Sequence, residues 1–542
     1  MKIIKLITLV LLSSNLAWAQ KPTVLKRPKL IVGIVVDQMR YDYLFKYFNK
    51  YSETGFKRLL NEGFNFSNTF YNYVPTYTAP GHASIYTGTT PAVNGIISNE
   101  WYSRIRGKSM YCVGDTTVKP VGTTSISGKM SPKNLLSTTI TDELRLHTNF
   151  KSKVIAIALK DRGAILPGGH TANAAYWHDP YLNKWISSTY YMDSLPQWVQ
   201  VYNAMKRPDE LLSTPWQTLL PITSYTESTT DDNRYESTYK NELRPVFPHR
   251  VDTLRNSDQE LIRRTPAGNV YTKEFALAAL KGEELGRSEG TDFLAISFSS
   301  PDYIGHQFGI NSIEVEDNYL RLDKDLSDLI DHLNINYGKS NYLLFLTADH
   351  GAALNVDFCD DHDLPGGRYK AVVEDSLKKY LNLLHGDGNW VLDANSHQIY
   401  LNRSLASEKQ VEICVLQNEV ATYLLNFPEF AFAMTACELN KQILRDGLAS
   451  FLQKGFNPQA SGDVSIVLNP AWMEWGRPGT THGAAYSYDT HVPWIMYGWN
   501  VNAGSTHTKV AIEDIAPTIC NFLNIGYPSG TTGTSRLYEI NK

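Results

Sequence analysis

A threonine and a set of acidic and histidine residues have the types needed for phosphoryl transfer. Thr78 lies in the segment Thr78-Ala-Pro-Gly-His82, directly before a predicted helix. A threonine hydroxyl is a poor nucleophile at neutral pH and needs a base or a metal ion to become an alkoxide. The residues with suitable metal-binding side chains are Asp37, Asp302, His306, Asp349, His350 and His482. Together they predict a two-metal site beside a threonine nucleophile.

The types and spacing of these side chains favour zinc. Two divalent ions roughly 4 Å apart can hold the attacking and the leaving oxygen of an in-line displacement at the same time. Imidazole nitrogen combined with carboxylate oxygen is a ligand set that zinc accepts while keeping an open position. Asp302 and His306 are spaced i and i+4, so on a helix both side chains lie on one face and can reach one ion.

Two cations could bind the phosphate itself. Lys160 and Arg162 are two residues apart at the end of a predicted strand, so in an extended chain they point to the same side. Arginine can bind two phosphate oxygens at once, and lysine adds a point charge. This pair favours a phosphate monoester, which carries two negative charges, over a diester, which carries one. Ordinary solvated surface charges are the alternative interpretation.

The elements that must position these residues follow an alternating pattern. Continuous apolar runs of strand length cover residues 29–36, 154–159, 293–298 and 341–347. Between them lie helical patterns such as 314–333, whose apolar residues form one stripe. Alternation of buried strands and helices predicts an α/β fold with a central, mostly parallel sheet. The runs end close to Asp37, Lys160, Asp302 and Asp349, and ligands of such sheets gather at the carboxyl ends of the strands.

Two long stretches, about 171–291 and about 355–475, interrupt this pattern and are rich in Tyr, Asn, Ser and Pro. We interpret them as insertions in a single catalytic domain that spans residues 20–542. They either cover the active site and influence substrate choice or form ordinary surface loops.

The N-terminus predicts export. Lys2 and Lys5 precede an apolar run from Leu6 to Leu12, and Ala17-Trp-Ala19 has the small-x-small pattern of a cleavage site. We expect a signal peptide over residues 1–19, cleavage after Ala19 and a periplasmic destination. The apolar run is shorter than the ~20 residues that span a bilayer, and no later segment is long enough, so no membrane span is expected.

Overall charge and cysteine content set further limits. The net charge is −4 without a basic cluster, so a nucleic acid polymer is not an expected partner. The five cysteines show no C-x-x-C spacing, and their odd number leaves at least one thiol unpaired. Their pairing cannot be deduced from sequence. They are Cys112, Cys359, Cys414, Cys437 and Cys520.

The order and spacing of the motifs resemble the alkaline phosphatase superfamily along nearly the whole mature chain. The motifs are Asp37, Thr78-Ala-Pro-Gly-His82, Asp302-x-x-x-His306, Asp349-His350-Gly351 and His482-Gly483. Within that superfamily, Asn99, Lys160 and Arg162 resemble the phosphate-binding residues of the monomeric, zinc-dependent alkaline phosphatases of the PafA type. The resemblance implies a three-layer α/β sandwich with the metal site at the strand ends.

The same resemblance implies roles for individual residues. One zinc ion would be held by Asp302, His306 and His482, and the other by Asp37, Asp349, His350 and the oxygen of Thr78. Thr78 would attack small phosphate monoesters, and the phosphothreonine intermediate would then be hydrolysed to release inorganic phosphate. The family pattern further implies a monomer with weak phosphodiesterase side activity.

Other interpretations are compatible with parts of the pattern. A nucleotide pyrophosphatase/phosphodiesterase of the same superfamily shares the zinc ligands and the threonine but lacks the lysine and arginine pair. An exported, non-catalytic protein that binds zinc or phosphate would keep the ligands and would not need a nucleophile. Thr78, two residues before a proline, is also a natural helix N-cap. We expect His82 and His491 to pack or support the site without binding metal.

Overall fold

The structure is a computed structural model that describes residues 27–369, 372–474 and 476–540. The predicted signal peptide over residues 1–19 and its cleavage site after Ala19 lie outside these ranges. Within the described ranges, we find no helix that is both long enough and apolar enough to cross a membrane.

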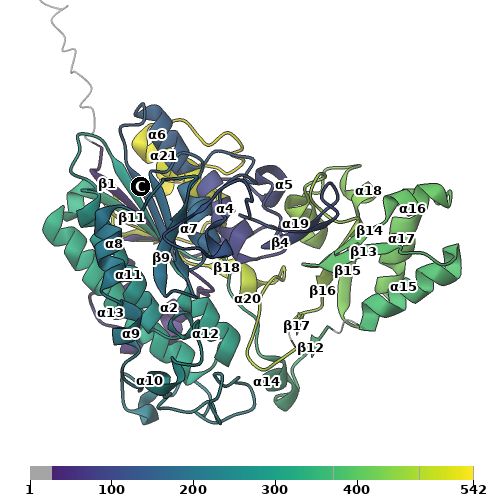
Figure 1. The fold of residues 1–542 in the computed structure, drawn as a ribbon, viewed down its shortest axis with the longest axis horizontal. Coiled ribbons are helices and arrows are strands. Elements are labelled where there is room, and N and C mark those ends of the chain that lie inside the picture. Colours follow the sequence, from purple (N-terminus) through teal and green to yellow (C-terminus); the bar gives the residue numbers. More distant parts are fainter. Residues whose placement is uncertain (1–26, 370–371, 475, 541–542) are drawn as a thin grey trace, which may run out of the picture.

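A ten-stranded sheet forms the centre of the described part of the chain (Figure 1). In spatial order its strands are β20 (Gly504–Thr506), β2 (Phe64–Phe66), β19 (Trp494–Gly498), β11 (Tyr342–Thr347), β1 (Leu30–Val36), β10 (Asp292–Phe298), β7 (Val154–Ala158), β8 (Ala174–Asp179), β9 (Lys184–Ser188) and β6 (Pro120–Val121). The five neighbours from β11 to β8 run parallel, whereas β19 and β9 pair antiparallel at either side. The predicted α/β fold with a mostly parallel sheet is confirmed.

The central strands are almost continuously apolar because helices cover both faces of the sheet. Every residue of β1, β7, β10 and β11 is buried. Helices α4 (Thr78–Thr87), α7 (Asp161–Gly168) and α21 (Ile515–Leu523) pack on one face, and α11 (Ala267–Gly282) and α13 (Ile313–Asn336) lie on the other (Figure 1). The predicted apolar stripe of α13 is buried, at Val315, Leu322, Leu326, Leu329, Ile330 and Leu333. The three layers place the carboxyl ends of the parallel strands at one edge.

The segment 171–291 is partly built into the main body. It supplies β8 and β9 to the central sheet and α11 to one of its faces. Between these elements lie short helices joined by long loops, such as α9 (Arg207–Leu211) and α10 (Val251–Leu254). The segment is therefore a mixture of sheet elements and surface loops.

The segment 355–475 contains a second sheet beside the main body (Figure 1, green). The sheet has the order β13 (Val391–Asn395), β14 (Gln398–Leu401), β16 (Val464–Leu468) and β15 (Phe430–Thr435). Helices α15 (Val372–His385), α16 (Arg403–Glu408) and α17 (Ile413–Leu424) accompany it, and it has its own apolar core. We call these elements the accessory subdomain.

The cysteines divide into one pair and three buried thiols. Cys414 in α17 forms a disulfide with Cys437 in α18 (Ala436–Leu439). Cys112, Cys359 and Cys520 are free and buried. The bond joins α17 of the accessory subdomain to α18, which directly follows its strand β15, so it does not connect the subdomain to the central sheet.

Candidate metal and phosphate site

Four predicted site residues follow adjacent parallel strands. In spatial order they are Asp349 after β11, Asp37 after β1, Asp302 after β10 and Lys160 after β7. All four side chains are buried. Positions far apart in the chain therefore meet at one edge of the sheet, as the sequence predicts.

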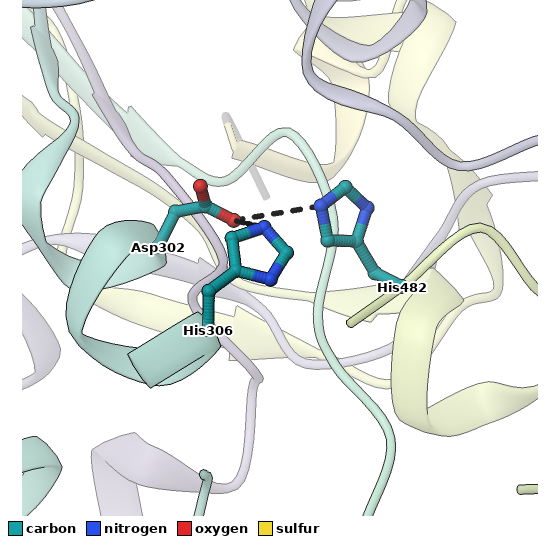
Figure 2. A group of neighbouring side chains, drawn as sticks. All are labelled: Asp302, His306 and His482. Atoms are coloured by element: carbon teal, nitrogen blue, oxygen red, sulfur yellow. Dashed lines mark ion pairs between the residues drawn. The ribbon is translucent and has the colours of Figure 1, made fainter. Parts of the chain in front are cut away.

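One group of possible metal ligands consists of Asp302, His306 and His482 (Figure 2). Helix α12 (Ser300–Phe308) carries the first two, and the imidazole Nε2 of His306 lies 3.1 Å from Asp302 Oδ1. His482 lies in the loop before α20 (Ser487–Thr490) and brings its Nε2 to 3.4 Å from the same oxygen. The expected i and i+4 arrangement on one helical face is present.

A second group lies directly beside the first and consists of Asp37, Asp302 and His350. The Nε2 atom of His350 lies 3.5 Å from Asp37 Oδ1 and 3.4 Å from Asp349 Oδ2. Asp302 thus takes part in both groups, and Asp349 contacts the second group through His350. The rings of His350 and His482 stack with centroids 3.4 Å apart, which joins the two groups.

The three histidines are oriented for metal binding by their backbone partners. In each ring Nδ1 donates to a carbonyl oxygen, which leaves Nε2 directed at the carboxylates. The hydrogen bonds are His306 to Thr480 (2.7 Å), His482 to Thr76 (2.7 Å) and His350 to Gly351 (2.9 Å). This is the tautomer in which a neutral imidazole can offer Nε2 to a cation.

Several ligand atoms lack a hydrogen-bond partner although they are buried. They are Asp37 Oδ1, Asp349 Oδ2 and His350 Nε2, whereas Asp37 Oδ2 is ion-paired with Lys160. Three buried carboxylates share the site with the ammonium of Lys160, so negative charge is in excess. Buried charge of this kind is costly unless it is paired or coordinates a metal. The donor set and the unpartnered atoms therefore fit divalent zinc.

The environment shifts the pKa of each carboxyl group. Burial raises the pKa of Asp37 to about 6, although the Lys160 ammonium opposes this shift. Burial and the charge of Asp37 hold the pKa of Asp349 well above its ordinary value. Burial also acts to raise the pKa of Asp302, but His306 and Lys160 outweigh it and hold this pKa well below the ordinary range. Asp302 is accordingly the carboxylate that is most stabilised in its charged form.

Lys160 connects both ligand groups to the candidate nucleophile. Its Nζ lies 2.7 Å from Asp37 Oδ2 and 2.5 Å from Asp302 Oδ2, and it donates to Thr78 Oγ1 at 3.3 Å. Burial lowers the pKa of Lys160, but Asp302 and Asp37 outweigh burial and raise the pKa above its ordinary value. A permanent positive charge therefore lies beside the Thr78 hydroxyl.

Thr78 is the first residue of helix α4, and Tyr77 is its N-cap, so the alternative that Thr78 caps the helix is wrong. The Thr78 side chain is buried and free of a capping role. Asn99 lies just before β4 (Glu100–Ser103), and its Oδ1 accepts a hydrogen bond of 2.9 Å from the backbone N–H of Ala79. This bond brings the Asn99 amide next to the start of the helix and to Thr78.

Arg162 reaches the site differently from the prediction. Lys160 is extended, but the chain enters helix α7 at Asp161, so the expectation of a chain extended as far as Arg162 is wrong. Arg162 still lies close enough to influence the pKa of Asp37 and of Lys160. Arg162 Nη1 donates to the Tyr111 hydroxyl at 2.9 Å, and that hydroxyl donates to Asp161 Oδ1 at 2.6 Å. Arg162 Nε is buried without a hydrogen-bond partner. The guanidinium is thus held by Tyr111 through Nη1, while its Nε donor is unpaired.

Gln38 is a site residue that the sequence analysis missed. Its Nε2 donates to Asp302 Oδ1 at 2.7 Å, and its backbone N–H donates to Asp349 Oδ1 at 3.1 Å. Its φ is 65°, which is unfavourable for a residue with a side chain, and the side chain is buried. Gln38 therefore holds two carboxylates from different strands in fixed orientations.

Replacing Gln38 tests this support. Gln38→Gly keeps a backbone that tolerates positive φ and removes the amide that donates to Asp302. We expect zinc affinity, and kcat/KM for an aryl phosphate monoester, to fall by roughly 10- to 100-fold, as happens when hydrogen-bond partners of metal ligands are removed. Zinc loss to a chelator and steady-state kinetics measure both.

Asn500 provides the matched control for the glycine substitution. Its φ is 56° and it is exposed, so Asn500→Gly makes the same backbone change away from the site. This variant should behave as wild type. Unchanged zinc affinity in Gln38→Gly would contradict the role we assign to Gln38.

His82 and His491, for which we expected supporting roles, lie outside both groups of candidate metal ligands. His82 Nδ1 donates to the Thr78 carbonyl at 2.9 Å, and burial lowers the pKa of His82 to about 3. His491 in β18 (His491–Val492) contacts the Ser67 carbonyl through Nε2 at 3.0 Å and stacks on Phe70. Neither belongs to the two ligand groups.

Comparison with known proteins places the chain in a family. The model of the type I phosphodiesterase / nucleotide pyrophosphatase family matches residues 31–484. Alkaline phosphatase PhoV of Synechococcus elongatus is 46% identical over 513 residues, which cover 94% of this chain and 93% of PhoV. A Myroides odoratus protein named calcium-transporting ATPase is 47% identical over 517 residues, with 94% of each chain covered.

A solved structure extends the comparison to three dimensions. The crystal structure of alkaline phosphatase PafA superposes with a TM-score of 0.92 at 42% identity and covers 95% of this chain and 99% of that chain. In sequence, PafA of Elizabethkingia meningoseptica is 43% identical over 528 residues, covering 97% of this chain and 96% of PafA. The chain belongs to the type I phosphodiesterase / nucleotide pyrophosphatase family. Within that family it is an alkaline phosphatase of the PafA type, as the motifs predict.

Proposed function

We propose that this chain is an exported phosphatase that hydrolyses small phosphate monoesters with two zinc ions and Thr78 as the nucleophile. The observation that carries the proposal is the position of Lys160, which joins Thr78 Oγ1 to one carboxylate of each ligand group. A hydroxyl held beside an ammonium and two candidate metal groups is placed for activation. The PhoV and PafA relatives, both alkaline phosphatases, support this reaction class.

We assign the metal ligands as the resemblance implies. Asp302, His306 and His482 would hold one zinc ion, and Asp37, Asp349 and His350, with the Thr78 oxygen, would hold the other. Bound zinc supplies positive charge that lowers the pKa of nearby hydroxyl groups and stabilises a departing alcohol oxygen. The unpartnered ligand atoms and the imidazole orientation described above support this assignment.

The residues of the chain then account for two transfer steps. In the first, Thr78 Oγ attacks phosphorus, the bond to the alcohol oxygen breaks, and phosphothreonine forms. In the second, water attacks phosphorus and the bond to Thr78 breaks, which releases inorganic phosphate. Asn99, Lys160 and Arg162 would donate to the non-bridging oxygens throughout, where preorganised donors have their largest effect.

The matched family makes phosphodiester hydrolysis the second candidate function. Its model carries the description phosphodiesterase / nucleotide pyrophosphatase. Lys160 and Arg162 argue for the monoester, because they place two positive charges where a diester offers one negative charge. We expect diester hydrolysis as a weak side activity.

The remaining proposals concern location and partners. We propose cleavage of the signal peptide after Ala19 and a periplasmic location, and the disulfide between Cys414 and Cys437 supports an oxidising compartment. We propose a monomer that acts on small molecules and has no nucleic acid partner.

Removal and return of metal test the proposed cofactor. Treatment with a chelator should abolish hydrolysis of an aryl phosphate monoester, and zinc should restore it, with two zinc ions bound per chain. Calcium and magnesium should restore little, because both prefer oxygen ligands to imidazole. Metal analysis and initial rates measure this. Full activity in metal-free protein would overturn the assignment.

A further inference from the structure

The tip of a hairpin in the accessory subdomain lies against the active site. Strands β13 and β14 are joined by a two-residue turn, Ser396-His397, flanked by the paired residues Asn395 and Gln398. Both turn residues have positive φ, 51° for Ser396 and 60° for His397. Turns of this shape favour asparagine and glycine, and other residues with side chains are disfavoured there. Backbone preference therefore does not explain why serine and histidine occupy this turn.

Ser396 contacts both neighbours of Asn99. Its Oγ accepts a hydrogen bond of 2.7 Å from Ser98 Oγ and donates to the Glu100 carbonyl at 3.2 Å. Asn99 itself accepts from the Ala79 N–H, one residue after Thr78. The serine hydroxyl thus fixes the segment that presents the Asn99 amide to the site.

His397 contacts the segment that carries His482. Its ring lies close enough to the Gly483 backbone to influence the pKa of His397, and its centroid lies 6.0 Å from that of Tyr77. His397, Tyr77 and His482 line the same small pocket. The Tyr77 ring in turn packs edge-on against His482 at 5.5 Å. Gly483 has a φ of 125°, and a Cβ there would lie 2.7 Å from the Tyr77 ring. The space left beside these rings is a pocket of about 50 Å³.

We propose that the Ser396-His397 turn is a positioning element of the active site. Ser396 holds the Asn99 segment in place, and His397 holds the His482 segment through Gly483 and Tyr77. The accessory subdomain thereby contributes to phosphate binding and to metal retention without supplying a group that touches the substrate. This inference rests on the proposed function, because it takes Asn99 as a phosphate donor and His482 as a metal ligand.

A substitution that relieves the backbone distinguishes positioning from a structural role. Ser396→Gly removes the hydroxyl and suits positive φ, so the melting temperature should stay the same or rise. We expect kcat/KM for an aryl phosphate monoester to fall roughly tenfold, because interaction free energies between contacting residues are typically of this size. The loss should shrink to less than about twofold when Asn99→Ala is already present.

Two further measurements complete the test. His397→Gly should release zinc to a chelator several-fold faster than wild type. Gln410→Gly is the matched control, because Gln410 has a φ of 57° in the same subdomain and is exposed, and it should behave as wild type. A folded Ser396→Gly protein with wild-type kcat/KM, or a tenfold loss that persists in Asn99→Ala, would overturn the proposal.

Inorganic phosphate binding separates this proposal from the proposed function. Ser396→Gly should weaken phosphate binding to the zinc-loaded protein roughly tenfold, and this readout does not require turnover. If wild type binds phosphate but fails to hydrolyse monoesters, the proposed function is wrong and the positioning role is judged on binding alone. If wild type hydrolyses monoesters and Ser396→Gly binds phosphate normally, only the positioning role is wrong.

Discussion

Thr78→Ala is expected to lower kcat for an aryl phosphate monoester by a factor on the order of 10⁴ or more, because it removes the attacking oxygen. Removal of a catalytic nucleophile lowers kcat by a factor of this size or larger, because the groups that activate the nucleophile then have no function. Thr78 is buried at the start of α4 with Lys160 Nζ 3.3 Å from its hydroxyl, so nearby water cannot readily take its place. Steady-state rates of the zinc-loaded variant measure the loss.

The same variant decides between an enzyme and a binding protein. Thr78→Ala should still bind inorganic phosphate, because Asn99, Lys160 and Arg162 are unchanged. Thr78→Ser is the matched control, since it keeps a hydroxyl at the same position and should retain much of the activity. A wild-type protein that binds phosphate without turnover would establish the non-catalytic alternative. Rapid quenching of the wild-type reaction should in addition trap phosphate on Thr78.

The sequence predicts the positions that depend on strand ends. Buried strands appear as continuous apolar runs, and parallel strands must end at a common edge. The sequence alone therefore brings Asp37, Lys160, Asp302 and Asp349 together. The observed strands differ from the predicted runs by a residue at each end at most. The spacing of Asp302 and His306 is equally informative, because helical periodicity places them on one face.

Features that depend on local backbone geometry were not predictable. The chain was expected to be extended as far as Arg162, but it enters α7 at Asp161, and Tyr111 accepts a hydrogen bond from the Arg162 guanidinium. Gln38 showed no signal, because its role requires positive φ and a partner, Asp302, that is 264 residues away. Contacts of this kind arise only when separate segments are packed together.

The accessory subdomain shows the same limit on a larger scale. Its residues could be recognised as an interruption of the strand and helix pattern, but nothing in their composition indicates which part of them faces the site. The contact between Ser98 and Ser396 joins positions 298 residues apart. The pairing of Cys414 with Cys437 likewise required the structure, because five cysteines allow several connectivities.

The Lys160→Ala/Arg162→Ala variant is expected to distinguish monoester from diester hydrolysis. With zinc in saturating excess, we expect kcat/KM for an aryl phosphate monoester to fall by a factor on the order of 10³ or more, while the rate with a methyl aryl phosphodiester changes little. Removing one donor that stabilises developing charge typically lowers kcat by a factor on the order of 10² to 10³. The effect should be larger for the monoester, because it carries one more negative charge than the diester. Rates with both substrates, and with an aryl sulfate, measure the preference.

Lys160 and Arg162 should contribute in different ways to the loss of monoester hydrolysis. Lys160 also neutralises Asp37 and Asp302, so Lys160→Ala alone should weaken the metal site as well as phosphate binding. Arg162 contacts Tyr111 and Asp161 and neither ligand group, so Arg162→Ala should retain zinc and lose only the monoester preference. Tyr111→Phe should reproduce part of the Arg162→Ala effect, since it frees the guanidinium. A wild-type preference for the diester would instead assign the chain to the nucleotide phosphodiesterase branch of its family.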